Sequence, residues 1–189
     1  MSYNIRNQPM YLQSGDPESE NAVSLLYPGS LGSRVTIKEP GVPGSPTTAG
    51  QYRHKTYQLV QSDSSMTTNP FKGAVAWWSD KTKFLATTSP TTLGRGRIAG
   101  IFRGNVTPGN FCFIQTQGPC PNVKFVDAPT SIPDAVGLGT FVIPSATAGK
   151  ADNLAAGSSP TYPPLGLSAG SWNPGDNTAT VDLDMPETP

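Results

Sequence analysis

The sequence predicts a mainly β protein: a small antiparallel β-barrel or sandwich with long extended N- and C-terminal arms. Gly and Pro each occur 20 times in 189 residues, about a fifth of the chain against an average of roughly 12%. Such a frequency of helix-breaking residues argues against long helices. Short runs rich in β-branched and aromatic residues recur every 8 to 12 residues or so, which is typical of an all-β domain. Apolar clusters are concentrated between Tyr52 and Ile143.

Residues 1–50 are expected to form an extended arm. Turn-forming residues interrupt this segment repeatedly, most densely in the run from Glu39 to Pro46. Only residues 34–38 alternate polar and apolar side chains as a strand does. We therefore expect an N-terminal arm with one short strand.

Residues 51–143 are expected to form the β-rich body. Its first strands are predicted at residues 57–61, 73–78 and 83–87. A β-meander should follow, with strands at 97–103, 111–117 and 122–126, a turn at 105–110 and a break at Gly118-Pro119. In the first meander strand, alternation places Ile98 and Phe102 on one face and Ile101 and Arg103 on the other.

The core of this body is expected to include the large apolar side chains of the meander. They are Ile98, Phe102, Phe111, Phe113 and Phe125. After residue 144 the chain becomes small and polar, and residues 144–189 are expected to form a second extended arm. Residues 180–184 alternate once more, which predicts a late strand in this arm.

Charge and hydropathy argue against two classes of partner. The chain has 13 basic and 13 acidic residues and no net charge, whereas nucleic-acid binding needs a clustered excess of Lys and Arg. No stretch approaches the roughly 18 apolar residues of a membrane span, and the first residues lack the apolar core of a signal peptide. We expect no nucleic-acid or membrane partner and synthesis in a cytoplasm.

The residues most often used in catalysis and metal binding are scarce. His54 is the single histidine, and Cys112 and Cys120 are the two cysteines. Seven residues separate the cysteines, not the two to four of a zinc knuckle. We expect Cys112 to be a buried strand residue and Cys120, between two prolines, to be a loop thiol. We therefore predict a protein that is not an enzyme, with no catalytic residues, no cofactor and no metal site.

Three further patterns resemble functional motifs but have simpler explanations. Asp182 and Asp184 would lie on one face of a strand, with Val181 and Leu183 inward, so we expect the two carboxylates to face water. The glycines between Gly94 and Gly100 lack the spacing and the strand–helix context of a dinucleotide loop. The nearby arginines, Arg95, Arg97 and Arg103, are expected in solvent or against carboxylates of a neighbouring protein.

The segment from Gly96 to Phe125 resembles the repeating core of tailed-phage capsid decoration (cement) proteins. In that family an Ala-Gly dipeptide begins an apolar strand, a turn containing Gly leads into an aromatic-aliphatic strand that ends in Gln, and a Gly precedes another strand. The corresponding elements here are Ala99-Gly100, Pro108-Gly109, Phe111 to Gln117, Gly118 and Asn122-Val123-Lys124-Phe125. Residues 49–75 match the family loosely. The proline-rich run Gly118-Pro119-Cys120-Pro121 departs from the pattern.

The resemblance implies a structural virion protein that binds the outside of a phage capsid and cements neighbouring capsomers. Its partners would be the major capsid protein and further copies of itself, in a symmetric trimer or dimer. Its localisation would be the capsid surface of the virion, after synthesis in the host cytoplasm, and the resemblance carries over no active site.

Two alternatives remain open from the sequence. One is another virion β-protein, such as a head fibre or tail adaptor, because arms with scattered aromatic residues suit that role as well. The other is a carbohydrate-binding β-sandwich in which Trp77, Trp78 and Trp172 stack on sugar rings. Because Trp77 and Trp78 are adjacent, a strand would point them to opposite faces, and at most one could form a platform.

Overall fold

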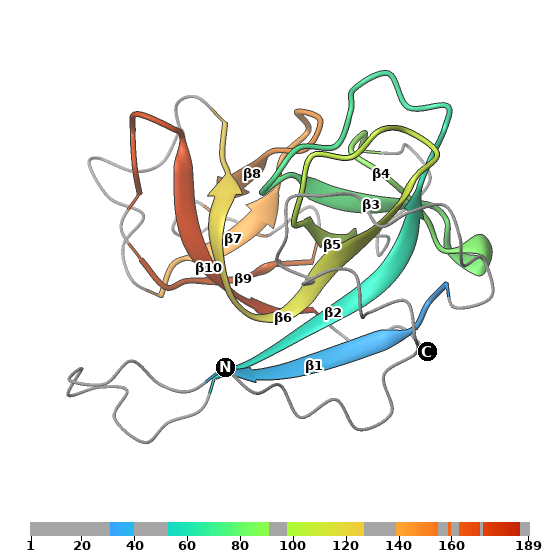
Figure 1. The fold of residues 1–189 in the computed structure, drawn as a ribbon. Helices are drawn as coiled ribbons and strands as arrows, with labels where there is room; N and C mark the ends of the chain where they lie inside the picture. The colour runs from blue at the N-terminus through green and yellow to red at the C-terminus, as the bar shows by residue number, and fades with distance from the viewer. Residues whose placement is uncertain are drawn as a thin grey trace.

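β-Strands make up almost all the regular structure of the described residues, as Figure 1 shows. The computed structural model describes residues 31–39, 53–90, 98–126, 139–154, 159, 163–170 and 172–185. The strands are β1 (Arg34–Glu39), β2 (Arg53–Ser62), β3 (Val75–Asp80), β4 (Leu85–Thr87), β5 (Ile98–Phe102), β6 (Phe111–Lys124), β7 (Phe141–Pro144), β8 (Ala151–Asn153), β9 (Gly166–Ser168) and β10 (Thr178–Asp184). One turn of 3-10 helix, Lys81–Lys83, joins β3 to β4.

Five of the strands close into a barrel. They follow the order β2, β4, β3, β5 and β6, and β6 pairs again with β2. Neighbours run antiparallel except β2 and β4, which are parallel. The predicted mainly β fold with a small barrel is confirmed. Closure leaves these five strands without the unpaired edges that invite aggregation.

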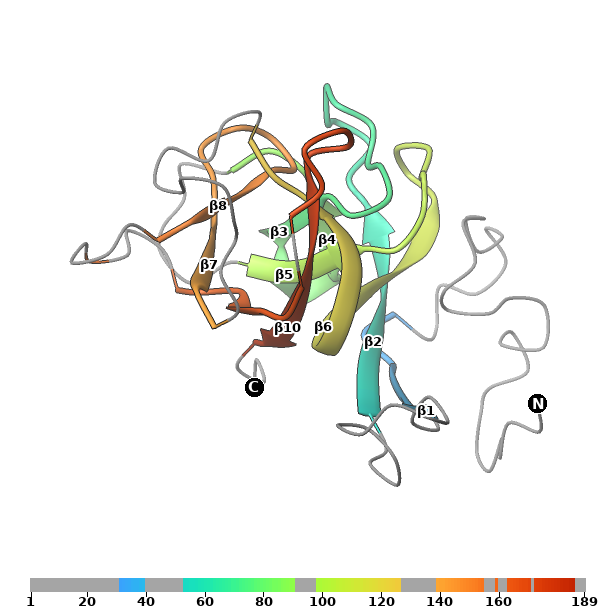
Figure 2. The ribbon, with the colours of Figure 1, turned by 90° about the vertical axis from the view of Figure 1, so that its left-hand side faces the viewer.

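The remaining strands extend the same sheet. β10 pairs with the second half of β6 and continues through β9 and β7 to β8. A parallel bridge between Phe125 and Ala151 brings β8 back to the end of β6, and the Val126 amide donates to the Ala151 carbonyl at 3.0 Å. A second apolar interior is therefore surrounded by β6, β10, β9, β7 and β8. Figure 2 shows these strands beside the barrel, with β6 common to both halves.

Three apolar clusters form the core. The barrel interior holds Val60, Ala74, Ala76, Trp78, Ala86, Ala99, Phe102, Val106, Cys112 and Ile114. The second interior holds Val75, Trp77, Ile101, Cys120, Val123, Phe125, Val142, Ala151, Leu165, Ala179, Val181, Leu183 and Met185. The third cluster lies where β1 and β2 meet the start of β6 and contains Val35, Tyr57, Leu59, Phe111 and Phe113, which we call the outer cluster.

The long strand β6 bends between the two halves, which Figure 1 shows at the lower centre. Its residues up to Gln117 pair with β2 and its residues from Gln117 on pair with β10. Gly118 has a φ of 80°, and a Cβ there would lie 1.9 Å from the His54 carbonyl oxygen. Only glycine accommodates this conformation and this close backbone approach without strain.

The core prediction is confirmed for the four phenylalanines, which are all buried, while Ile98 is partly buried. The predicted faces of β5 are confirmed for Phe102 against Ile101 and Arg103, and wrong for Ile98. The register between β5 and β3 shifts by one residue. Gly100 pairs with Ala76, but Ile98 pairs with Trp77. This irregularity places Ile98 and Ile101 against the second interior, and Phe102 in the barrel.

Two predicted boundaries are also corrected. Gly118-Pro119 does not break a strand, so the expected second and third strands of the meander are one strand, β6. The expected C-terminal arm is not extended in its described parts: β8, β9 and β10 belong to the sheet, and Leu165, Val181 and Leu183 are core residues. The late strand itself is confirmed as β10. The short strand expected in the N-terminal arm, residues 1–50, is confirmed as β1, and residues 1–30 and 40–50 of that arm lie outside the described residues.

Candidate functional site

The histidine and the cysteines lie apart and hold no common site. His54 is exposed on β2, and Cys112 is buried in the barrel, where burial raises the pKa of its thiol far above the usual range. Cys120 was expected in a loop, but it is a fully buried residue of β6. Within the described residues, no three His, Cys, Asp or Glu side chains come together as metal ligands would.

The predicted orientation of β10 is confirmed, and the tryptophan platform is wrong. Asp182 and Asp184 are exposed, whereas Val181 and Leu183 are buried. Trp77 and Trp78 do point to opposite faces, but each face is an apolar interior and both rings are buried. Trp172 is half-buried against the second interior. The three rings therefore offer no shared surface on which a sugar could stack.

Arg103 also departs from the expectation of a solvent-facing arginine. Only 4% of it is exposed. Its Nη1 donates to the Pro121 carbonyl at 3.1 Å and lies 3.3 Å from the Cys120 sulfur, and its Nε has no partner. Within the described part of the chain no carboxylate pairs with this guanidinium, which is unusual for a buried charge. Arg95 and Arg97 lie outside the described residues.

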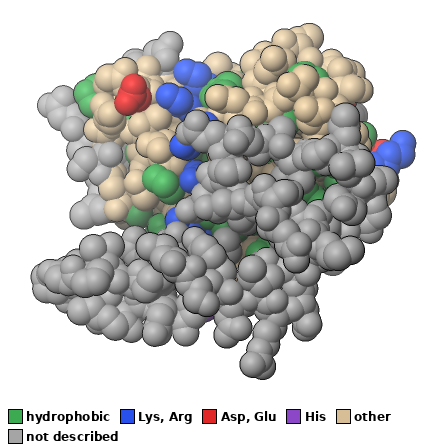
Figure 3. Space-filling model, viewed as in Figure 1, with side chains coloured by type: hydrophobic (Ala, Val, Ile, Leu, Met, Phe, Trp, Pro, Cys, Tyr) green, Lys and Arg blue, Asp and Glu red, His purple; other side chains and the backbone are tan. Residues whose placement is uncertain are grey.

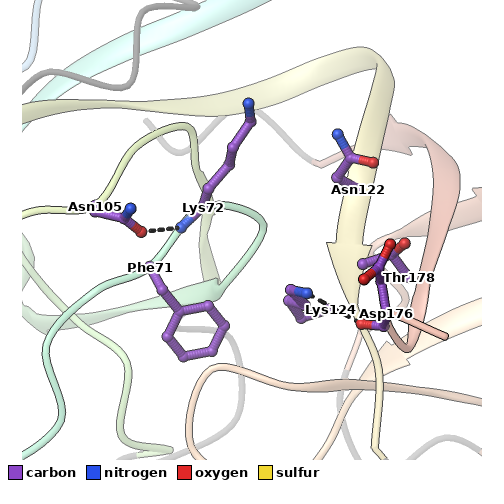
Figure 4. A pocket seen from close by; sticks show the side chains of 7 residues that line it. All are labelled: Phe71, Lys72, Asn105, Asn122, Lys124, Asp176 and Thr178. Carbon is purple, nitrogen blue, oxygen red and sulfur yellow. Dashed lines mark hydrogen bonds between the residues drawn. The ribbon is translucent and has the colours of Figure 1, made fainter.

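A cleft of about 380 Å³ opens beside the second half of β6. Figure 4 shows its two walls: Phe71, Lys72 and Asn105 on one side, and β6 with the turn before β10 on the other. The lining residues are Phe71, Lys72, Asn105, Asn122, Lys124, Asp176 and Thr178. They come from four separate segments of the chain, so the cleft exists only in the folded protein.

Close backbone packing holds the two walls together. Gly73, with a φ of 84°, lies so near β6 that a Cβ there would be 1.9 Å from the Asn122 carbonyl oxygen. The Lys124 amide donates to the Gly73 carbonyl at 2.9 Å. On the first wall, the Lys72 amide donates to the Asn105 Oδ1 at 3.1 Å. Asn122 has a φ of 62° at a shift in the β6–β10 register, and its side chain is exposed at the cleft.

Lys124 at the cleft is not paired with the Asp176 carboxylate. Lys124 Nζ donates to the Asp176 backbone carbonyl at 3.0 Å. The Asp176 carboxylate instead accepts a hydrogen bond from the Asn173 amide at 3.0 Å. Buried Arg103 lies behind this wall, since it binds the carbonyl of Pro121, next to Asn122. Figure 3 shows basic side chains gathered in a band on one face of the molecule.

A second surface feature lies on the outside of the second half. Phe141 of β7 and Leu167 of β9 are register partners and are 52% and 42% exposed. Leu167 in turn pairs with exposed Asp182 of β10. Large apolar side chains grouped on a rigid sheet are a common element of protein interfaces.

No known family, no curated protein and no solved structure was found to match this chain. In the described part of the chain, no helix has the length and apolar character needed to cross a membrane.

The sequence did not indicate either surface feature. The cleft joins residues up to 107 positions apart, from 71 to 178, and none of them belongs to a recognisable motif. Phe141 falls within the predicted β-rich body, residues 51–143, and nothing in the run from Phe141 to Pro144 separates an exposed first residue from buried ones. The one local signal was Asn122, because Asn adopts positive φ more readily than most residues.

Proposed function

We propose that this chain is a capsid decoration protein that binds the outside of a phage head and cements neighbouring capsomers. The observation that carries the proposal is the place of the resembling segment in the fold. Residues 96–125 include β5 and β6, and β6 is the strand common to the barrel and the second half. The family-like sequence thus lies in the structural centre of the β body, not in a peripheral loop.

The shape of the body suits a cementing role. A closed barrel and a second strand-lined interior give a rigid support, and rigid partners lose little entropy on binding. The Phe141–Leu167 pair supplies an apolar contact on this support. We propose that this pair contacts the major capsid protein, and that copies of the chain assemble as a symmetric dimer or trimer, on the virion surface. The proposed role requires no catalysis.

The proposal is tested by counting the protein on purified heads of the phage that encodes it. Quantitative mass spectrometry should give a copy number related to the major capsid protein by a simple symmetry ratio. Heads stripped of the protein should bind it again from solution. Its absence from purified heads, or a variable trace amount, would refute the proposal.

A paired substitution tests the proposed contact. Replacing both Phe141 and Leu167 by Ser removes exposed apolar surface, so the fold should remain while affinity for stripped heads falls. Interface residues of this kind contribute about 1 to 2 kcal/mol each when they are buried by a partner. Ser64→Ala, at an exposed site in the loop after β2, is the control and should bind as the wild type does. Equal binding by the double variant would show that capsid contact lies elsewhere.

A further inference from the structure

The cleft beside the second half of β6 presents polar groups that the described part of the protein does not use. The Asn122 side-chain amide and the Thr178 hydroxyl make no hydrogen bond to any described residue. The Asn105 Oδ1 accepts from a backbone amide, which leaves Nδ2 as a donor. The Asp176 Oδ2 accepts from Asn173, which leaves Oδ1 as an acceptor. The lining therefore offers both donors and acceptors to a ligand.

This mixture of groups suits hydroxyls better than anions. A carboxylate or phosphate only accepts hydrogen bonds, and in the cleft it would meet the second oxygen of the Asp176 carboxylate. The Lys124 ammonium is directed at a neutral carbonyl, that of Asp176, at 3.0 Å. A hydroxyl both donates and accepts, so it can bind an amide, another hydroxyl or a carboxylate oxygen. A molecule with several hydroxyls would satisfy these lining groups together.

The apolar part of the lining is the ring of Phe71. This residue is half-buried and packs against the barrel interior. Figure 4 shows its ring on the wall opposite Asn122 and Thr178. The face of an aromatic ring carries negative charge density, which attracts the polarised C–H groups of a sugar. A pyranose has C–H groups on its faces and hydroxyls around its edge, so it matches both the ring and the polar groups.

The two walls are fixed before any ligand arrives. The Lys124 amide donates to the Gly73 carbonyl at 2.9 Å, and Gly73 packs closely on the Asn122 backbone. Asn122 itself has a φ of 62°. Non-glycine residues with such a backbone occur often at functional sites. A site that is already formed loses less entropy when a ligand binds.

We propose that this cleft binds a neutral sugar, a pyranose ring without a charged substituent. One face of the ring packs on Phe71, and its hydroxyls bind Asn122, Asp176 and Thr178. The cleft volume of about 380 Å³ lies within the range of small-molecule sites, roughly 300 to 1,000 Å³. The proposed binding does not rest on attachment to a capsid.

An amide NMR titration of the whole protein with the methyl glycosides of glucose, galactose and mannose tests the proposal. At least one glycoside should shift the amide signals of residues 105, 122, 124 and 178 saturably, with a Kd on the order of 1 mM. Its affinity should change little as salt is raised, because the ligand is uncharged. Sorbitol has hydroxyls but no ring, and galacturonate adds a carboxylate. Each should bind about tenfold more weakly or not at all.

Two variants connect the binding to the cleft. Asn122→Gly keeps the positive φ but removes the amide, and Thr178→Val keeps the shape of the side chain but removes the hydroxyl. Each should weaken glycoside binding about fivefold, the effect of one lost hydrogen bond. Thr67→Val makes the same chemical change at an exposed loop residue outside the cleft lining. It is the matched control and should bind as the wild type does.

Four outcomes would overturn the proposal. The first is the absence of saturable shifts with all three glycosides. The second is equal or tighter binding of galacturonate, which would make the cleft a site for anions. The third is equal binding of sorbitol, which would remove the ring contact with Phe71. The fourth is undiminished glycoside binding by both cleft variants, which would place the sugar elsewhere on the protein.

Discussion

Phe113→Ala is expected to destabilise the protein strongly, because Phe113 is a buried member of the outer cluster. The side chain is 6% exposed and packs with Tyr57, Leu59, Phe111 and Val35. A buried Phe removes about 150 Å² or more of surface from water, which at about 25 cal/mol per Å² gives roughly 4 kcal/mol. Substitutions of Phe by Ala in cores cost about 3 to 5 kcal/mol. β1 is an edge strand that contributes Val35 to this cluster and can move into part of the cavity, so we expect a loss of about 3 kcal/mol.

Urea unfolding followed by tryptophan fluorescence measures this loss, since Trp77 and Trp78 are buried reporters in the two interiors. The slope of the free energy against urea should stay the same while the midpoint falls. Phe141→Ala is the matched control, because that ring is 52% exposed, and it should change stability by less than about 0.5 kcal/mol. If both variants lose the same stability, the outer cluster is not packed as described.

Two further predictions concern the bend in β6 and the buried thiol. Gly118→Ala should cost several kcal/mol more than Gly139→Ala: both glycines have a positive φ, near 80°, but an added Cβ meets the His54 carbonyl at 1.9 Å in the first case and no atom within 4 Å in the second. Equal midpoints in urea would contradict the close approach at the bend. Cys112 stays protonated in the fold because burial raises the pKa of its thiol, whereas the unfolded thiol ionises near pH 8.5. The stabilisation that comes from keeping this thiol protonated is therefore complete below that pH. Above it, the free energy of unfolding falls by up to about 1.4 kcal/mol per pH unit. Cys112→Ala should remove this dependence of the free energy of unfolding on pH. An unchanged dependence would show that the thiol is exposed to water in the folded protein.

Local patterns predicted the strands well because they reflect one side chain facing in and the next facing out. The alternation of β10 placed Val181 inward and Asp182 outward correctly. The same rule failed at Ile98 on β5, where the register shift beside Trp77 changes the face. That shift depends on the partner strand, so no pattern within residues 98–102 could reveal it.

The two boundary errors also have physical causes. Gly118-Pro119 usually ends a strand, but here the glycine lets β6 leave one partner and join another without interruption. β8 and β9 have three residues each, too few to show alternation, and they are strands only because β7 and β10 pair with them. Polar composition after residue 144 therefore indicated an arm where the fold has short strands within the sheet.

The cleft could not be predicted, for a related reason. Each of its residues has an ordinary local role in a turn or strand, and the site arises when Gly73 packs on Asn122 and brings the two walls together. Long-range closure of this kind leaves no periodic signal in the sequence.

The most direct test of the cementing function is the rupture temperature of phage heads with and without this protein. Heads are stripped of it and heated alone, with wild-type protein restored, or with Phe113→Ala added. We predict that the wild-type protein raises the rupture temperature and that the destabilised variant raises it less. Equal rupture temperatures in all three samples would contradict the cementing function, even if the protein is found on the heads.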